Sequence, residues 1–108
     1  MLEKGDYKSF YFFVSNAVRE YIGRRYAIHA LDSTTQELLY DLDAQPKGEE
    51  VIPLMKGFLT RCDLVKFAKF KPSLEQAEAA QEAAFTIVTV CEEVFKKHRI
   101  AQLGSINQ

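Results

Sequence analysis

Apolar and polar residues recur along this chain with the period of α-helices, and four segments carry the pattern. The first runs from Tyr7 to Tyr26, where apolar side chains return at steps of three and four residues. These positions are Phe10, Phe13, Val14, Ala17, Val18, Tyr21 and Ile22. This spacing places them on one face of a helix. Ser9 is expected to cap its start, and Arg24 and Arg25 fall in the last turn, where positive charge complements the helix dipole.

Two shorter helical segments follow. Thr34 and Glu37 form a capping box, in which each side chain accepts a backbone N–H of the other residue. The helix that they open is expected to end by Asp43 and to bury Leu38, Leu39 and Leu42. The third helix is expected to begin at Glu49 or Glu50 and tolerates Pro53 in its first turn. Its apolar stripe consists of Val51, Leu54, Met55, Phe58, Leu59 and Cys62.

Residues 63–70 are short enough to fit either a helical turn or a strand. We favour a helical turn capped by Asp63, with Lys66 and Lys69 pointing outward because they fall between the apolar positions. The apolar residues of the turn are expected to pack under the first and fourth helices. These residues are Leu64, Phe67 and Ala68.

The fourth segment is the longest. Ser73 and Gln76 form a second capping box after Pro72. A helical stripe then continues as far as Arg99, which is about 25 residues or roughly 37 Å. Its first half is rich in alanine, so a partner helix can approach closely there. The tail after Ile100 is expected to be frayed.

These segments and their short connections predict one all-α domain over residues 1–108, with an ordered core over about residues 7–99. The expected fold is a four-helix antiparallel bundle with a long C-terminal helix. The alternative is a winged-helix-like arrangement with a short strand at 63–70. Such a domain is large enough for a single core without staples.

Charge is arranged in blocks although the chain as a whole carries a net charge of −1. Residues 56–71 sum to +4, whereas residues 32–50 and residues 73–93 each sum to −5. A nucleic-acid binder needs a dominant basic surface, and these alternating blocks do not provide one, so nucleic acid is an unlikely partner. The alternative function is nonetheless a winged-helix nucleic-acid-binding domain, which the basic block at residues 56–71 would serve. No apolar run reaches the roughly 18–20 residues of a membrane helix.

Residues that carry catalysis or bind metals are scarce. The glycines stand singly, and Cys62, Cys91, His29 and His98 lack the clustering of a zinc site. The two cysteines are expected to be buried thiols, with one long-range disulfide as the alternative. The sequence therefore predicts no enzymatic activity, no metal and no cofactor.

Basic residues, most of them in the stretch from residue 61 to residue 71, are the candidate partner-binding residues. They are Lys66, Lys69 and Lys71, supported by Arg61, with Arg24 and Arg25 as a second patch. The competing interpretation is an ordinary solvated surface. Blocks of opposite charge also suit a domain with complementary surfaces, so self-association is a further possibility.

An ordered set of short segments resembles a known bacterial domain. The set consists of Tyr11-Phe12-Phe13-Val14-Ser15 leading into Arg19-Glu20-Tyr21, Ile28-x-Ala30-Leu31 before Thr34-Thr35-x-Glu37-Leu38, and Asp63-Leu64-Val65-Lys66-Phe67-Ala68-Lys69 followed by Pro72-Ser73. It is similar to the cytosolic region of BatD-like and related small bacterial membrane proteins. Those proteins are encoded beside MoxR-type AAA+ ATPases and proteins with von Willebrand factor A domains.

The resemblance covers about residues 10–90 and implies a non-enzymatic protein–protein interaction module. Its expected partners are the AAA+ ATPase or the von Willebrand factor A protein. The expected location is cytoplasmic, at the inner face of the cytoplasmic membrane. Members usually carry a membrane helix ahead of this region, so a membrane tether before Met1 is expected in the full protein.

Overall fold

Four α-helices make up the fold of residues 6–106, as the sequence predicts. The computed structural model describes the backbone of residues 6–106 and the side chains of residues 6–100. The helices are α1 (Tyr7–Tyr26), α2 (Thr35–Asp43), α3 (Ile52–Phe67) and α4 (Leu74–Ile106). Between residues 6 and 106 there is no strand. The all-α bundle with a long C-terminal helix is confirmed, and the winged-helix alternative with a strand at 63–70 is wrong.

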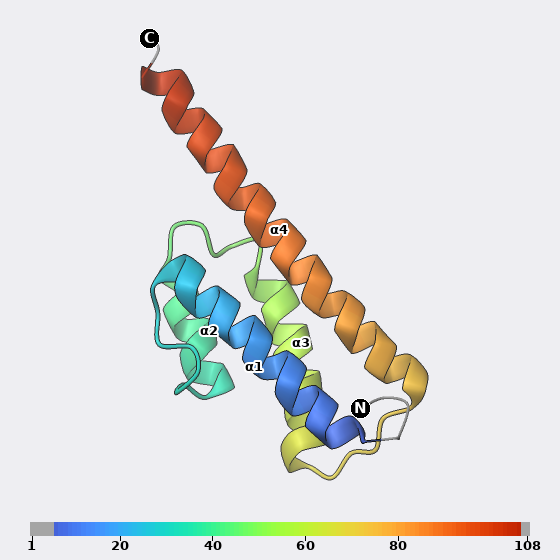
Figure 1. Cartoon of the computed structure of the whole chain (residues 1–108). Coiled ribbons are helices and arrows are strands. Elements are labelled where there is room, and N and C mark those ends of the chain that lie inside the picture. Colours follow the sequence, from blue (N-terminus) through green and yellow to red (C-terminus); the bar gives the residue numbers. More distant parts are fainter. Residues whose placement is uncertain (1–5, 107–108) are drawn as a thin grey trace.

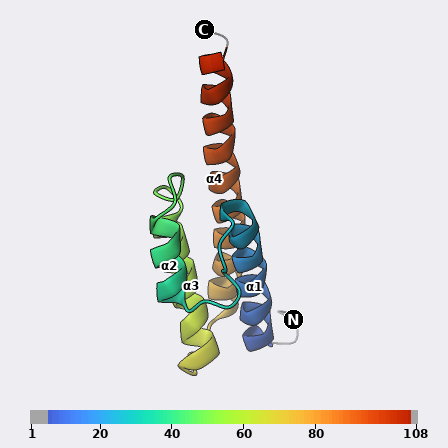
Figure 2. The same cartoon turned by 90° about the vertical axis from the view of Figure 1, so that its left-hand side faces the viewer.

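α3 is the central helix. It contacts each of the other three, and α1 also packs against α4. Figures 1 and 2 show α3 running antiparallel to α1, α2 and α4. Because α1 and α2 therefore point the same way, residues 27–34 return along the side of the bundle to connect them. α4 projects well beyond the other helices (Figure 1), so the molecule is elongated and measures 56 × 25 × 18 Å.

The core is drawn from all four helices. Its largest fully buried side chains are Ile22, Leu38, Leu42, Met55, Leu59 and Ile87. Ala77 and Ala80 are also buried, which lets the first half of α4 approach its neighbours closely. Cys62 and Cys91 are buried free thiols, so the prediction of reduced core cysteines is confirmed and the disulfide alternative is wrong.

The buried face of α1 is broader than its predicted stripe and is rotated from it. Phe13 and Ala17 were expected inside, but both are exposed. A second buried line, made of Tyr11, Ser15 and Arg19 at steps of four residues, takes their place. The physical reason is that α1 packs against both α3 and α4, and two neighbours cover a wider arc than one stripe.

Both predicted capping boxes are present. The backbone N–H of Glu37 donates to Thr34 Oγ1 at 3.2 Å, and the N–H of Thr34 donates to Glu37 Oε1 at 3.0 Å. Ser73 and Gln76 exchange the same pair of bonds at 3.1 and 2.8 Å. Each box satisfies backbone donors that a helix start leaves without intrahelical partners.

Other helix ends differ from the prediction. Asp6, not Ser9, caps α1, because Asp6 Oδ1 accepts the backbone N–H of Ser9 at 3.2 Å. α3 begins at Ile52, two to three residues later than expected. α4 continues beyond Arg99 to Ile106. The side chains of the tail that was expected to fray lie outside the described residues, so that part stays a prediction.

Asp63 does not cap a turn. It lies inside α3, which continues without a break to Phe67. Its carboxylate instead accepts a hydrogen bond from the hydroxyl of Thr35 at 2.6 Å and so ties the end of α3 to the start of α2.

The predicted packing of the last turn of α3 is also wrong. Leu64 and Ala68 are exposed, and Phe67 is 71% exposed. The buried side chain of this turn is Val65, which continues the core stripe from Cys62. Residues at steps of three or four share a face, so burying Val65 turns Leu64 and Phe67 toward solvent.

Candidate functional site

Three lysines lie between residues 66 and 71, at the end of the bundle where α1 begins and α3 ends. There they line a hollow of about 660 Å³, together with residues of the connection to α4. We name it the basic–aromatic hollow and define it by Lys8, Lys66, Phe67, Lys69, Phe70 and Lys71. It brings together the three lysines that the sequence singled out.

The charge of the hollow is strongly asymmetric. Four lysines line it, whereas Asp6 is the one carboxylate among its lining residues. Asp6 is also engaged as the cap of α1. Sequence reasoning missed Lys8, because it lies far from the basic block and joins the other lysines only through the packing of α1 on α3.

Exposed aromatic rings adjoin these lysines. The rings of Phe12 and Phe67 meet edge to face, with centroids 6.4 Å apart. Lys66 Nζ lies 4.8 Å from the centroid of Phe12 and 5.2 Å from that of Phe67, within the range of cation–π attraction. Both rings remain exposed. Aromatic side chains are enriched at protein interfaces, so this cluster is typical of a contact surface.

Lys69 occupies a backbone position that normally goes to glycine. Its φ is 56°, in the left-handed region, and it directly follows Ala68, the C-cap of α3. The N–H of Phe70 then donates to the carbonyl of Leu64 at 3.2 Å and closes the helix end. A residue with a Cβ costs about 1–2 kcal/mol in this conformation. Helix stability alone would therefore favour glycine here.

Arg61 borders the hollow without lining it. It lines an adjacent hollow of about 330 Å³ with Tyr11, Leu64 and Phe70. Phe70 lines both hollows, so Arg61 extends the same end of the molecule along α3.

The predicted second patch is at the opposite end of α1, and both of its arginines are paired. Arg24 Nη2 donates to Glu20 Oε1 at 2.6 Å, one turn earlier in α1. Arg25 pairs with Glu92 of α4, and its guanidinium lies 5.0 Å from the ring centroid of Phe95. The two arginines therefore act mainly within the fold and do not join the basic–aromatic hollow.

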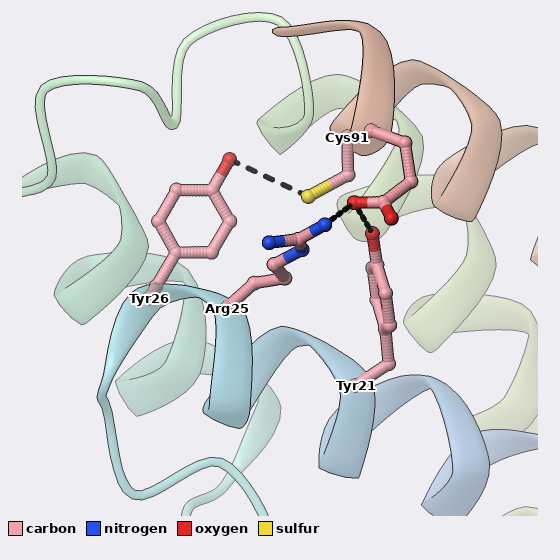
Figure 3. Close-up of polar contacts among 5 residues, drawn as sticks. Tyr21, Arg25, Tyr26 and Cys91 are labelled. Atoms are coloured by element: carbon pink, nitrogen blue, oxygen red, sulfur yellow. Dashed lines mark hydrogen bonds and ion pairs between the residues drawn. The ribbon is translucent and has the colours of Figure 1, made fainter. Parts of the chain in front are cut away.

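A group of polar contacts holds the end of α1 against α4 (Figure 3). The Tyr21 hydroxyl donates to Glu92 at 2.8 Å, and Arg25 donates to the same carboxylate. The Cys91 thiol contacts the Tyr26 hydroxyl at 3.9 Å. Burial raises the pKa of Tyr21 and of Tyr26, so both hydroxyls stay neutral at physiological pH. With Cys91 fully buried, these contacts serve as a structural clasp.

Arg19 is a buried charged residue that sequence reasoning left without a role. Its Nη1 donates to the carbonyls of Ala30 at 2.9 Å and Ser33 at 2.7 Å, and its Nη2 donates to Thr35 Oγ1 at 3.2 Å. Thr35 in turn donates to Asp63. One side chain thus joins α1, the 27–34 connection, α2 and α3. One indication of its burial was available in the sequence: Arg19 directly follows Val18 and precedes Ile22 by three residues, so it borders the predicted apolar face of α1.

The described residues hold no group of three His, Cys, Asp or Glu side chains able to bind a metal ion. Within the same part of the chain, no helix is long and apolar enough to cross a membrane. Burial raises the pKa of the Cys62 thiol to about 12, so it is protonated at physiological pH and is a poor nucleophile.

Comparisons of the chain with protein-family models, with curated proteins and with solved structures gave no significant match. Function is therefore inferred from the surface of the molecule, in particular from the basic–aromatic hollow and its exposed rings.

Proposed function

We propose that this chain is a non-enzymatic protein-binding domain whose contact surface is the basic–aromatic hollow. The observation that carries the proposal is the concentration of exposed aromatic rings and lysines at one end of the bundle. Phe67 is mostly exposed and Phe12 partly so, and exposed apolar area beside charge is typical of interaction sites.

The conformation of Lys69 supports a binding role over an ordinary solvated surface. In the described part of the chain, Lys69 and Ala27, the C-cap of α1, are the non-glycine residues with a positive φ, a conformation that costs stability. Residues in strained backbone conformations are concentrated at functional sites. The charge that Lys69 adds to the hollow gives a reason for its presence.

The chemistry of the hollow favours a partner with an acidic surface that also presents an apolar side chain. The resemblance to BatD-like proteins supplies the first candidates, a MoxR-type AAA+ ATPase or a von Willebrand factor A protein at the inner face of the cytoplasmic membrane. The proposed location in the cytoplasm follows from the same resemblance.

A pull-down with the immobilised candidate partner tests the proposal. Lys66→Glu with Lys69→Glu reverses two charges in the hollow and should abolish capture. The matched control is Lys96→Glu with Lys97→Glu, which makes the same charge change at two exposed positions of α4. Equal capture of both variants, with unchanged far-UV circular dichroism, would contradict the proposal.

A further inference from the structure

The outer face of α2 is acidic and presents a single aromatic side chain. Tyr40 is 78% exposed, the highest value among the large hydrophobic side chains of residues 6–100. Asp41 and Asp43 flank it, and α2 contains no lysine or arginine. This face, defined by Tyr40, Asp41 and Asp43, is named the acidic tyrosine face.

Folding does not account for these residues. Asp41 and Asp43 lie in the last turn of α2, where the helix dipole disfavours negative charge. Tyr40 leaves most of its ring in water, so its burial adds little to stability. Stability therefore does not explain why Tyr40, Asp41 and Asp43 stand at these positions, whereas a binding role does.

The acidic tyrosine face is complementary to the basic–aromatic hollow. One presents carboxylates around a phenol ring, and the other presents lysines around a depression of about 660 Å³ with Phe67 and Phe70 in its wall. No residue of α2 lines the hollow, so the two surfaces do not occupy each other within one chain.

We infer that the hollow receives the acidic tyrosine face of a second copy of this chain. The inference rests on the proposed function, because it assigns a partner to the same hollow. The two surfaces of such a contact differ, so the association is heterologous: in a bound pair one copy still offers a free α2 face and the other a free hollow. Copies then add head to tail, as a ring or an open row. Charge attraction between exposed groups makes the association sensitive to salt.

Sedimentation velocity of the whole chain, over a wide range of concentrations, tests the inference. At low salt the weight-average sedimentation coefficient should rise with concentration, and salt near ~0.5 M should suppress the rise. Tyr40→Ser should abolish it, and so should Lys66→Glu with Lys69→Glu. The paired Lys96→Glu and Lys97→Glu change should leave it intact. All four mutated lysines and Tyr40 avoid the buried core, so each variant should unfold at nearly the parental urea concentration.

Mixing the two association-deficient variants gives the decisive measurement. The Tyr40→Ser chain keeps an intact hollow, and the Lys66→Glu, Lys69→Glu chain keeps an intact acidic tyrosine face. Together they can form one native contact, after which both remaining surfaces are the mutated ones. A 1:1 complex that does not grow with concentration is therefore expected.

Three results overturn the inference: a parent chain that stays monomeric at every concentration, association that either variant retains, or a mixture that remains monomeric. None of these bears on capture of a foreign partner. If the parent is monomeric but the hollow variant still loses its partner in the pull-down, the proposed function stands and the self-association is wrong. If the hollow variant keeps its partner, the proposed function is wrong.

Discussion

Removing the guanidinium of Arg19 is expected to weaken the fold severely, whereas the same change at Arg24 is expected to do little. Arg19 is 6% exposed and donates three hydrogen bonds to two carbonyls and a hydroxyl. In Arg19→Met these acceptors lose their donor while remaining partly or fully buried. The aliphatic part of the side chain is kept, so the change probes the polar contacts more than the packing.

The magnitude follows from the number and charge of these bonds. A hydrogen bond from a charged donor contributes roughly 1.5–3 kcal/mol, and bonds from one group are not additive. We expect Arg19→Met to cost about 3–5 kcal/mol, a large part of the ~5–15 kcal/mol that stabilises a domain. Arg24→Met should cost less than about 1 kcal/mol, because its pair with Glu20 is exposed.

Urea unfolding followed by circular dichroism separates the two outcomes. With a slope of about 2 kcal/mol per molar urea, the midpoint of Arg19→Met should fall by roughly 1.5–2.5 M at unchanged slope. Arg19→Lys should lie between it and the parent, since an ammonium keeps the charge without the fork of donors. Equal midpoints for Arg19→Met and Arg24→Met would refute the structural role assigned to Arg19.

Three further outcomes are expected. Lys69→Gly should stabilise the fold by about 0.5–1 kcal/mol in urea unfolding, because glycine adopts the left-handed conformation freely. The same variant should bind its partner more weakly, and a loss of stability would contradict the backbone argument. Phe67→Ala should cost less than about 1 kcal/mol because its ring is mostly in water, whereas Phe58→Ala in the core should cost about 3–5 kcal/mol. Equal urea midpoints for the two would contradict the exposure of Phe67. The raised pKa of Cys62 makes the folded state hold a proton that the unfolded state releases above its ordinary value of 9.0, so stability should fall between pH 9.0 and about 12. Cys62→Ala should reduce that fall, and an unchanged pH profile would show that the thiol does not cause it.

Local signals were enough to predict the helices. The capping boxes at Thr34 and Ser73 depend only on residues three positions apart, and both formed. The apolar period of α3 predicted the burial of Met55, Phe58 and Leu59 for the same reason, since one helix face is defined by spacing alone.

The wrong predictions arose where a choice between faces depended on neighbouring helices. The last turn of α3 offers Val65 on one side and Leu64 with Phe67 on another, and both sides are apolar. Only the position of α3 in the centre of the bundle decides that Val65 is buried. The hydrogen bonds of Arg19 could not be predicted either, because two of its acceptors lie in the 27–34 connection, whose path no periodicity describes.

Several residues that depart from stability rules fall on two surfaces, although Ala27 with positive φ and the exposed Phe13 and Phe85 lie on neither. Lys69 in a left-handed conformation and Phe67 in water belong to the basic–aromatic hollow. Aspartates at the C-terminal end of α2 and an exposed Tyr40 belong to the acidic tyrosine face. Natural sequences are mostly consistent between local preference and fold, and departures from that consistency are expected at functional sites. The two surfaces are opposite in charge and share an aromatic component, which is why each is assigned to binding and why one is proposed as the partner of the other.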